Sequence, residues 1–139
     1  MTEEQLTTAM RPFFPPDTVE EIAHIVYNYK LTLKVVSPRK CRLGTCYKNK
    51  SVITVNANLP PYMFLLVTLH EIGHFVSLQK YGLHIQPHGK EWQQEYSKLL
   101  KHFLYKGVFP SKLAELVMQE IIKPKATCSL QLMEVASSY

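Results

Sequence analysis

This sequence of 139 residues has neither a long apolar run nor the pattern of a secretion signal. Its longest apolar run, Met63 to Val67, is far shorter than the roughly 18 residues that a membrane-spanning helix needs. The first ten residues, MTEEQLTTAM, carry acids where a secretion signal carries bases. We therefore predict a cytoplasmic protein that does not bind a membrane.

Cysteine is scarce, and no two cysteines form a C-x-x-C pair. Cys41, Cys46 and Cys128 are also an odd number. Neither a disulfide framework nor a cysteine zinc knuckle is indicated by this spacing. We expect buried free thiols instead, because unpaired cysteine usually behaves as a small apolar residue.

Acidic residues are missing between Glu21 and Glu71, although the net charge of the whole chain is only +5. The same span holds seven cations, so one face of the protein is predicted to be strongly positive. Such a face is either a solvated basic hairpin or an electrostatic footprint for phosphates, as in DNA. The cations are Lys30, Lys34, Arg39, Lys40, Arg42, Lys48 and Lys50.

The length and composition predict one folded domain. Apolar residues make up 46% of the chain and charged residues 19%, which is typical of a globular protein, and 139 residues are too few for two ordinary domains. Prolines lie at both ends of the stretch whose apolar residues recur at regular spacing, with Pro15 and Pro16 before it and Pro124 after it. We expect an irregular N-terminal arm over residues 1–16, a single domain over 17–122 and a C-terminal tail over 123–139.

Hydrophobic periodicity predicts an α+β fold. A helix is expected over 18–29, with Asp17 as its N-cap and Glu20 completing a capping box. Three strands, the first from Leu31 to near Ser37 and Pro38 and the others over 43–47 and 51–56, are expected to form a small antiparallel sheet. Helices should follow over 61–81, where Gly82 is the stop, then from Gly89 to about 105, and over 111–122. The 61–81 segment is apolar nearly all round at its start, so it should be the buried central helix.

The central helix contains the motif His70-Glu71-Ile72-Gly73-His74, which has the pattern H-E-x-x-H. Residues four apart lie one above the other on a helix, so both imidazoles can reach one cation while Glu71 projects beside them. With a third protein ligand, a tetrahedral zinc ion keeps one position for water and lowers the pKa of that water. Glu71 would act as the general base that takes its proton.

The setting of the motif favours a metal site over a chance match. Two histidines and a carboxylate in a buried helix are costly unless they have a partner. Gly73 adds a smaller argument, because glycine inside a helix costs about 0.5 to 1 kcal/mol relative to alanine. Close approach of a strand or of the metal loop would explain this glycine.

The residues alone offer several candidates for the third metal ligand. Ser77 and Lys80 exclude the extended motif H-E-x-x-H-x-x-G-x-x-H. His88 is favoured, because Pro87 stiffens the chain before it and Gly89 lets the chain turn into the next helix. The alternatives are Glu91 or Glu95 on that helix, and His84 in the loop. His24 and His102 lie on other predicted helices, where surface or packing roles are expected.

The sequence resembles the SprT-like domain family of zinc metallopeptidases, which includes bacterial SprT and the Spartan proteases of DNA–protein crosslink repair. The resemblance covers roughly residues 17 to 105, with the elements in the family's order. It rests on Leu59 and on four short stretches, which are R-L-G-T-C-Y at 42–47, I-T-V-N at 53–56, H-E-I-G-H at 70–74 and H-G-K-E-W at 88–92.

The resemblance implies one zinc ion held by His70, His74 and His88, with Glu71 as the general base. It also implies a zincin-like core whose edge strand could hold an extended substrate beside the metal. Many members carry a C-terminal cysteine zinc ribbon or a DNA-binding extension. In this sequence Cys128 is the one cysteine after the predicted domain, and the basic span from Lys30 to Lys50 could substitute for such an extension.

We therefore predict a zinc-dependent metallopeptidase that acts on a protein or peptide substrate, with DNA-associated proteins as one candidate class. Tyr81, Tyr96 and Tyr105 could stabilise an oxyanion, although core packing is the simpler role for each. The alternative function is a DNA-associated or regulatory zinc protein with little or no peptidase activity. Nothing in the sequence predicts the oligomeric state.

Overall fold

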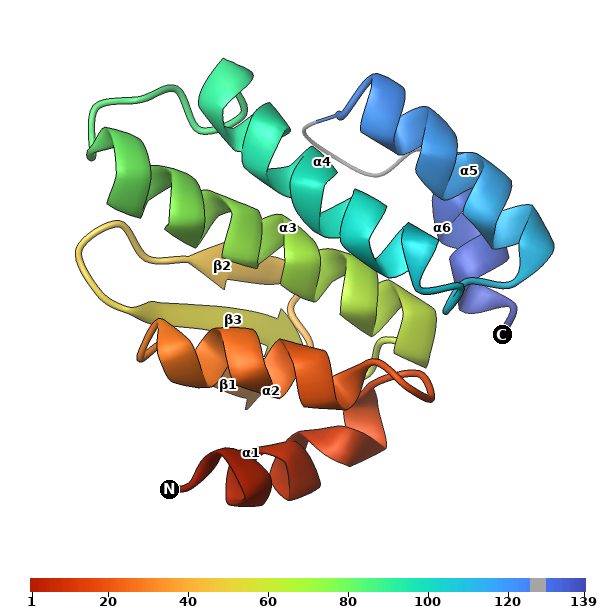
Figure 1. Ribbon diagram of the computed structural model, residues 1–139, viewed down its shortest axis with the longest axis horizontal. Coiled ribbons are helices and arrows are strands. Elements are labelled where there is room, and N and C mark those ends of the chain that lie inside the picture. Colours follow the sequence, from red (N-terminus) through yellow and green to blue (C-terminus); the bar gives the residue numbers. More distant parts are fainter. Residues whose placement is uncertain (126–129) are drawn as a thin grey trace.

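The computed structural model describes residues 1–125 and 130–139. It is a mixed chain of helices and strands, which is compatible with the predicted α+β class. A three-stranded sheet and a set of helices enclose one long central helix, α3, which crosses the middle of the molecule (Figure 1). In chain order the elements are α1 (Glu3–Met10), η1 (Arg11–Phe13), α2 (Val19–Asn28), β1 (Thr32–Val36), β2 (Gly44–Cys46), β3 (Val52–Asn56), α3 (Pro61–Tyr81), α4 (Lys90–Tyr105), α5 (Ser111–Ile122) and α6 (Leu130–Ser137).

The N-terminal arm predicted as irregular is in fact helical. Thr2 and Gln5 form a reciprocal capping box at the start of α1, and Met10 and Phe14 bury their side chains in the core. The capping box predicted at Asp17 and Glu20 is wrong. Asp17 has a φ of 65° and the N-cap is Thr18, whose hydroxyl donates to the carbonyl of Pro15 instead of accepting from the helix. This backbone turn, rather than a side-chain cap, starts α2.

The sheet is only partly antiparallel, which corrects the sequence prediction. The strand order is β1-β3-β2, with β3 parallel to β1 and antiparallel to β2. After β1 the chain crosses to the far edge of the sheet, forms β2 and returns through the middle as β3. A parallel pair such as β1 and β3 needs a long connection, and here β2 is part of it. Arg39 stabilises this crossover, since its guanidinium donates to Asn56, Thr45 and Thr54.

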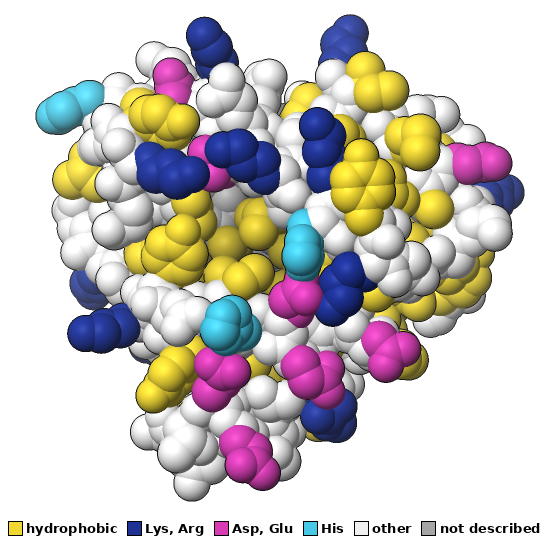
Figure 2. Space-filling model, viewed as in Figure 1, with side chains coloured by type: hydrophobic (Ala, Val, Ile, Leu, Met, Phe, Trp, Pro, Cys, Tyr) yellow, Lys and Arg dark blue, Asp and Glu magenta, His cyan; other side chains and the backbone are white. Residues whose placement is uncertain are grey.

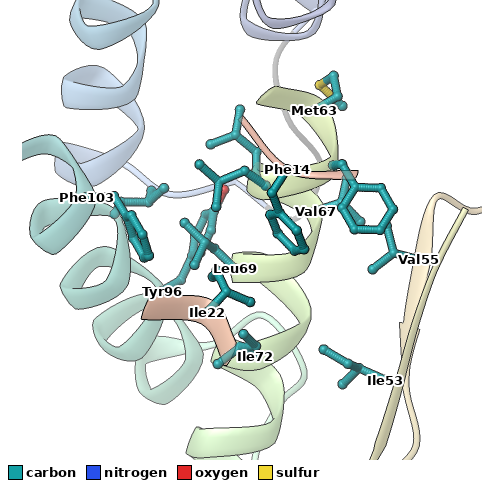
Figure 3. Close-up of a cluster of buried hydrophobic side chains, with 14 of the residues drawn as sticks. Phe14, Ile22, Ile53, Val55, Met63, Val67, Leu69, Ile72, Tyr96 and Phe103 are labelled. Carbon is teal, nitrogen blue, oxygen red and sulfur yellow. The ribbon is translucent and has the colours of Figure 1, made fainter. Parts of the chain in front are cut away.

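The central helix α3 is buried along most of its length, as predicted. It packs against β2 and β3 on one side and against α4 and α6 on the other. Figure 3 shows its apolar side chains reaching both toward the sheet, where Ile53 and Val55 lie, and toward α4, where Tyr96 and Phe103 lie. Among the described residues, no helix is long and apolar enough to cross a lipid bilayer.

The C-terminal tail also belongs to the fold. Helix α6 packs on α5 and α3, with Leu132 and Ala136 buried. The buried carboxylate of Glu120 accepts a hydrogen bond from the backbone N–H of Lys125, just after the end of α5. Helix α6, which lies in the predicted C-terminal tail, thus packs against the helix that carries the H-E-x-x-H motif.

Candidate metal centre

His70 and His74 lie on one face of α3, as their spacing of four residues predicts. Their Nε2 atoms are 3.2 Å apart. The two rings are part-buried between α3, the loop that follows α3, and the first turns of α4. The central helix therefore positions two metal-ligand atoms side by side.

His88 joins this pair from the loop between α3 and α4. Gly82 ends α3 with a φ of 91°, a conformation that glycine adopts without steric cost, and the chain then turns back. The His88 Nε2 atom lies 3.1 Å from that of His74 and 3.3 Å from that of His70. The side chain of Gln93 donates to the His88 carbonyl and fixes the backbone there.

The three histidines fit a single metal ion. Two nitrogens bound at about 2.0–2.1 Å in tetrahedral geometry lie about 3.3–3.4 Å apart, close to the distances between these Nε2 atoms. Burial lowers the pKa of His70 to about 3 and that of His74 to about 4, with the neighbouring imidazoles adding to the effect. The rings are therefore neutral at pH 7, the form that binds metal.

The other residues weighed as a third ligand lie outside this cluster. His84 is exposed in the loop. Glu95 is buried, but its carboxylate forms ion pairs with Lys80 at 3.1 Å and Lys98 at 3.4 Å. Glu91 is half-buried in the first turn of α4. Of the candidate third ligands, the structure therefore places His88 next to His70 and His74.

Glu71 lies in the same pocket as the histidines without belonging to the cluster. The residue is only 7% exposed. Burial raises the pKa of this carboxyl to about 7, while the positive charge of Arg39 acts in the opposite direction. A carboxyl in this pKa range can accept and release a proton near neutral pH.

Trp92 forms the floor beneath the histidines, a role that the sequence analysis did not predict. This fully buried indole donates from Nε1 to the carbonyl of His70 at 3.2 Å. Its ring centre lies 4.7 Å from that of His70, 5.3 Å from His74 and 4.8 Å from His88. The sequence feature that could have predicted this role is that the chain's one tryptophan stands four residues after His88, one helical turn away.

Gly73 is explained by the same contact. A Cβ atom added there would lie 3.2 Å from Nε1 of Trp92 and 3.4 Å from Cα of Tyr96. The glycine therefore lets α4 approach α3 closely. A close neighbour was expected from the sequence, but that neighbour is a helix and neither a strand nor the metal loop.

The histidines and Glu71 open into a cavity of about 750 Å³. Strand β2 forms one side of the cavity through Gly44 and Cys46, and the C-terminal segment contributes Lys125 and Met133. The cavity gives a ligand access to the Nε2 atoms and to Glu71 together. Among the described residues that line it, none is a tyrosine, so Tyr81, Tyr96 and Tyr105 contribute no hydroxyl to its wall.

The cysteines are less buried than predicted. Cys41 is exposed and Cys46 is half-buried, and both have free thiols. Burial, with the nearby charge of Glu71, raises the pKa of the Cys46 thiol to about 12, so it is not a nucleophile at neutral pH. Cys128 lies outside the described residues.

The remaining histidines take surface roles, as predicted. His24 contacts Glu3 at 3.2 Å and Asn28 at 2.8 Å. His102 pairs with Glu21 between α4 and α2.

Comparison with protein families, curated proteins and solved structures finds no match to this chain. The SprT-like resemblance therefore stays a prediction that rests on the short stretches quoted above. The geometry of the site stands independently of it.

Gly44 holds the edge strand against the motif helix, and we expect Gly44→Ala to destabilise the fold. The new Cβ would lie 2.8 Å from Cγ1 of Val67 and 2.9 Å from the carbonyl oxygen of Thr54, so strand and helix must separate. Overpacking of this kind costs about 1–3 kcal/mol. Urea unfolding would measure it, with the exposed Thr32→Ala as control. Equal stability of Gly44→Ala and wild type would contradict this packing.

Glu71 should also make the stability of the metal-free protein depend on pH. Burial raises its folded-state pKa from 4.5 to about 7, so a charged Glu71 destabilises the fold above pH 7 and has no such effect below 4.5. We expect metal-free Glu71→Gln to be more stable than wild type by about 3 kcal/mol at pH 8.

The test is urea unfolding with a chelator at pH 8 and at pH 4. The difference between the two proteins should shrink as the pH falls from 7 to 4.5. A difference of the same size at both pH values would contradict the raised pKa of Glu71.

Proposed function

We propose that this chain is a zinc-dependent metallopeptidase of the SprT-like type, with a zincin-like core. The observation that carries the proposal is the convergence of three Nε2 atoms, 3.1 to 3.3 Å apart, beside a buried carboxylate in an open cavity. A structural metal would need no neighbouring base and no access for a ligand. Both features favour a hydrolase.

His70, His74 and His88 would hold the ion. When bound, zinc supplies Lewis acidity that polarises a peptide carbonyl and lowers the pKa of water. Glu71 would accept the proton of the attacking water on its carboxylate and pass it to the leaving amine. Trp92 holds the His70 backbone and fills the space behind the three rings, which keeps the ligands in place.

The free edge of β2 supports a peptide as the substrate. Leu43 and Tyr47 are hydrogen-bonded to β3, so by antiparallel alternation the peptide groups of Gly44 and Cys46 face away from the sheet. These two residues also line the cavity that contains Glu71. An extended chain could therefore pair with β2 and present its backbone to the metal centre.

The test is cleavage of an unfolded protein such as casein by the purified chain, followed by mass spectrometry. We expect cleavage with one equivalent of zinc, loss of cleavage with a chelator, and recovery when zinc is restored. Cleavage that continues with the chelator would count against the proposal, and so would the absence of cleavage in a protein that holds zinc.

The alternative function is that of a DNA-associated zinc protein with little or no peptidase activity. The observation in its favour is that six of the seven cations between Lys30 and Lys50 are exposed, whereas Arg39 is occupied on the sheet. DNA binding through this span should weaken steeply as salt rises and should fall when Lys48 and Lys50 are neutralised. A zinc-loaded chain that binds DNA in this way but cleaves no protein would favour the alternative.

A further inference from the structure

The cavity beside the metal centre has a basic rim. Arg42 and Lys48 flank β2, and Lys125 reaches the cavity from the C-terminal segment. All three residues are exposed. Among the described residues that line the cavity, Glu71 is the only acid, and it is buried in the wall.

The inner wall of the cavity is largely aliphatic. Its large aliphatic side chains are those of Leu43 beside β2, Val67 and Leu78 on α3, Ile85 in the loop after α3, and Met133 on α6. Val67 is buried, and the others are half-buried. Such a wall favours a large aliphatic side chain, because burying apolar surface is favourable and this surface offers few polar partners.

Several acids of the protein lie away from this rim. In Figure 2 acidic side chains cluster over α1 and α2, and in sequence Glu3, Glu4, Glu20 and Glu21 belong to these helices. Between Glu21 and Glu71, the stretch that includes β2, the chain has no acid. A negatively charged ligand at the cavity rim would therefore meet cations at Arg42 and Lys48. Beside Lys125 the nearest acid is Glu120, which is buried and hydrogen-bonded to the Lys125 backbone.

We propose that the cavity selects peptide segments that combine one large aliphatic side chain with acidic side chains within two or three residues of it. The aliphatic group would enter the cavity, and the acids would face Arg42, Lys48 and Lys125 at its rim. This inference rests on the proposed peptidase function and names its substrate class.

An acidic peptide fits this site better than a nucleic acid does. Single-stranded nucleic acids bind where aromatic side chains stack on the bases inside a basic groove. Among the described residues that line the cavity, none is a phenylalanine, tyrosine or tryptophan. The aliphatic wall and the free edge of β2 both match a peptide instead.

The first experiment measures binding to zinc-loaded Glu71→Gln protein by fluorescence anisotropy. The probes are four labelled ten-residue peptides, three with a central leucine flanked by Glu, Ser or Lys, and one with Glu flanking a central glycine. At low salt we expect the Glu–Leu peptide to bind roughly tenfold more tightly than the Lys–Leu peptide, with the Ser peptide between them. The preference should weaken as salt rises. The glycine peptide should bind weakly.

Charge-reversal variants test which residues cause the preference for acidic over basic peptides. Arg42→Glu, Lys48→Glu and Lys125→Glu should each reduce it, and all three positions are exposed, so the fold should tolerate them. Lys101→Glu is the matched control, because Lys101 is exposed on α4 and does not line the cavity. Wild-type protein incubated with a mixed peptide library should cleave beside aliphatic residues with acidic neighbours.

The outcomes separate this inference from the proposed function. Metal-dependent cleavage without any preference for acids would overturn the inference and leave the peptidase in place. No metal-dependent cleavage of any library peptide would overturn the proposed function. Displacement of the Glu–Leu peptide by single-stranded DNA at lower concentration than by unlabelled peptide would show that the rim binds nucleic acid and would overturn the inference. Equal binding of the three leucine peptides would do the same.

Discussion

Glu71→Gln is expected to lower the rate of peptide cleavage by about 10³-fold while leaving one zinc ion per chain. Glutamine keeps the shape of the side chain but cannot accept the proton of water, and general-base catalysis typically contributes about 10²–10⁴-fold. The metal stays because Glu71 lies outside the cluster of Nε2 atoms. The measurements are the turnover number and the metal content of the same preparation.

Glu91→Gln is the matched control for this prediction. Glu91 is a half-buried glutamate in the first turn of α4, close in sequence to His88 but outside the ligand cluster. Its replacement should leave both zinc content and turnover near the wild-type values. Undiminished cleavage by Glu71→Gln would remove Glu71 from the catalytic role, and loss of zinc from that variant would make it a ligand.

His88→Ala is expected to weaken zinc binding by at least about 100-fold, and His84→Ala should leave it unchanged. Removing one of three imidazoles leaves a site of two nitrogens, and even changes to groups that only orient metal ligands cost about 10–100-fold in affinity. Both histidines lie in the loop between α3 and α4, but His88 points its Nε2 at His70 and His74 whereas His84 is exposed.

The measurement is a competition titration of zinc against a chelator of known affinity. The two variants remove the same chemical group from one loop, so the comparison separates ligation from general effects of losing a histidine. Equal zinc affinity for His88→Ala and wild type would contradict the three-histidine site. Loss of affinity in His84→Ala would point to a different ligand set.

Features governed by local periodicity could be predicted from the sequence. The bounds of α3 follow from its apolar start, from prolines tolerated in the first turn and from Gly82 after its end. The pairing of His70 and His74 follows from helical geometry alone. The preference for His88 follows from Pro87 and Gly89, which constrain the chain around it, and the structure does bring its ring to the other two.

Features that depend on contacts between distant segments were missed. Alternation of apolar residues indicates a strand but not its direction, so the parallel pairing of β1 with β3 could not be predicted. The long crossover is stabilised by Arg39, which looked like one more surface cation in the sequence. The role of Trp92 depends on how closely α4 approaches α3 at Gly73, which no local pattern reveals.

The two ends of the chain differ from the sequence prediction for a related reason. Prolines near residue 12 suggested an irregular arm, yet Thr2 and Gln5 cap a short helix before them. The C-terminal segment has no strong motif, although Leu132 and Ala136 are buried and Met133 lines the cavity. Short helices of this kind are stabilised mainly by tertiary packing, so their sequences carry weak signals.

The most direct test of the metal centre is a crystal structure of the zinc-loaded protein with anomalous diffraction recorded at the zinc absorption edge. We predict one anomalous peak, bonded at about 2.0–2.1 Å to the Nε2 atoms of His70, His74 and His88, with Glu71 beside it and not bonded to it. A zinc peak held by other residues, or no peak between these three rings in a protein shown to contain zinc, would contradict the account.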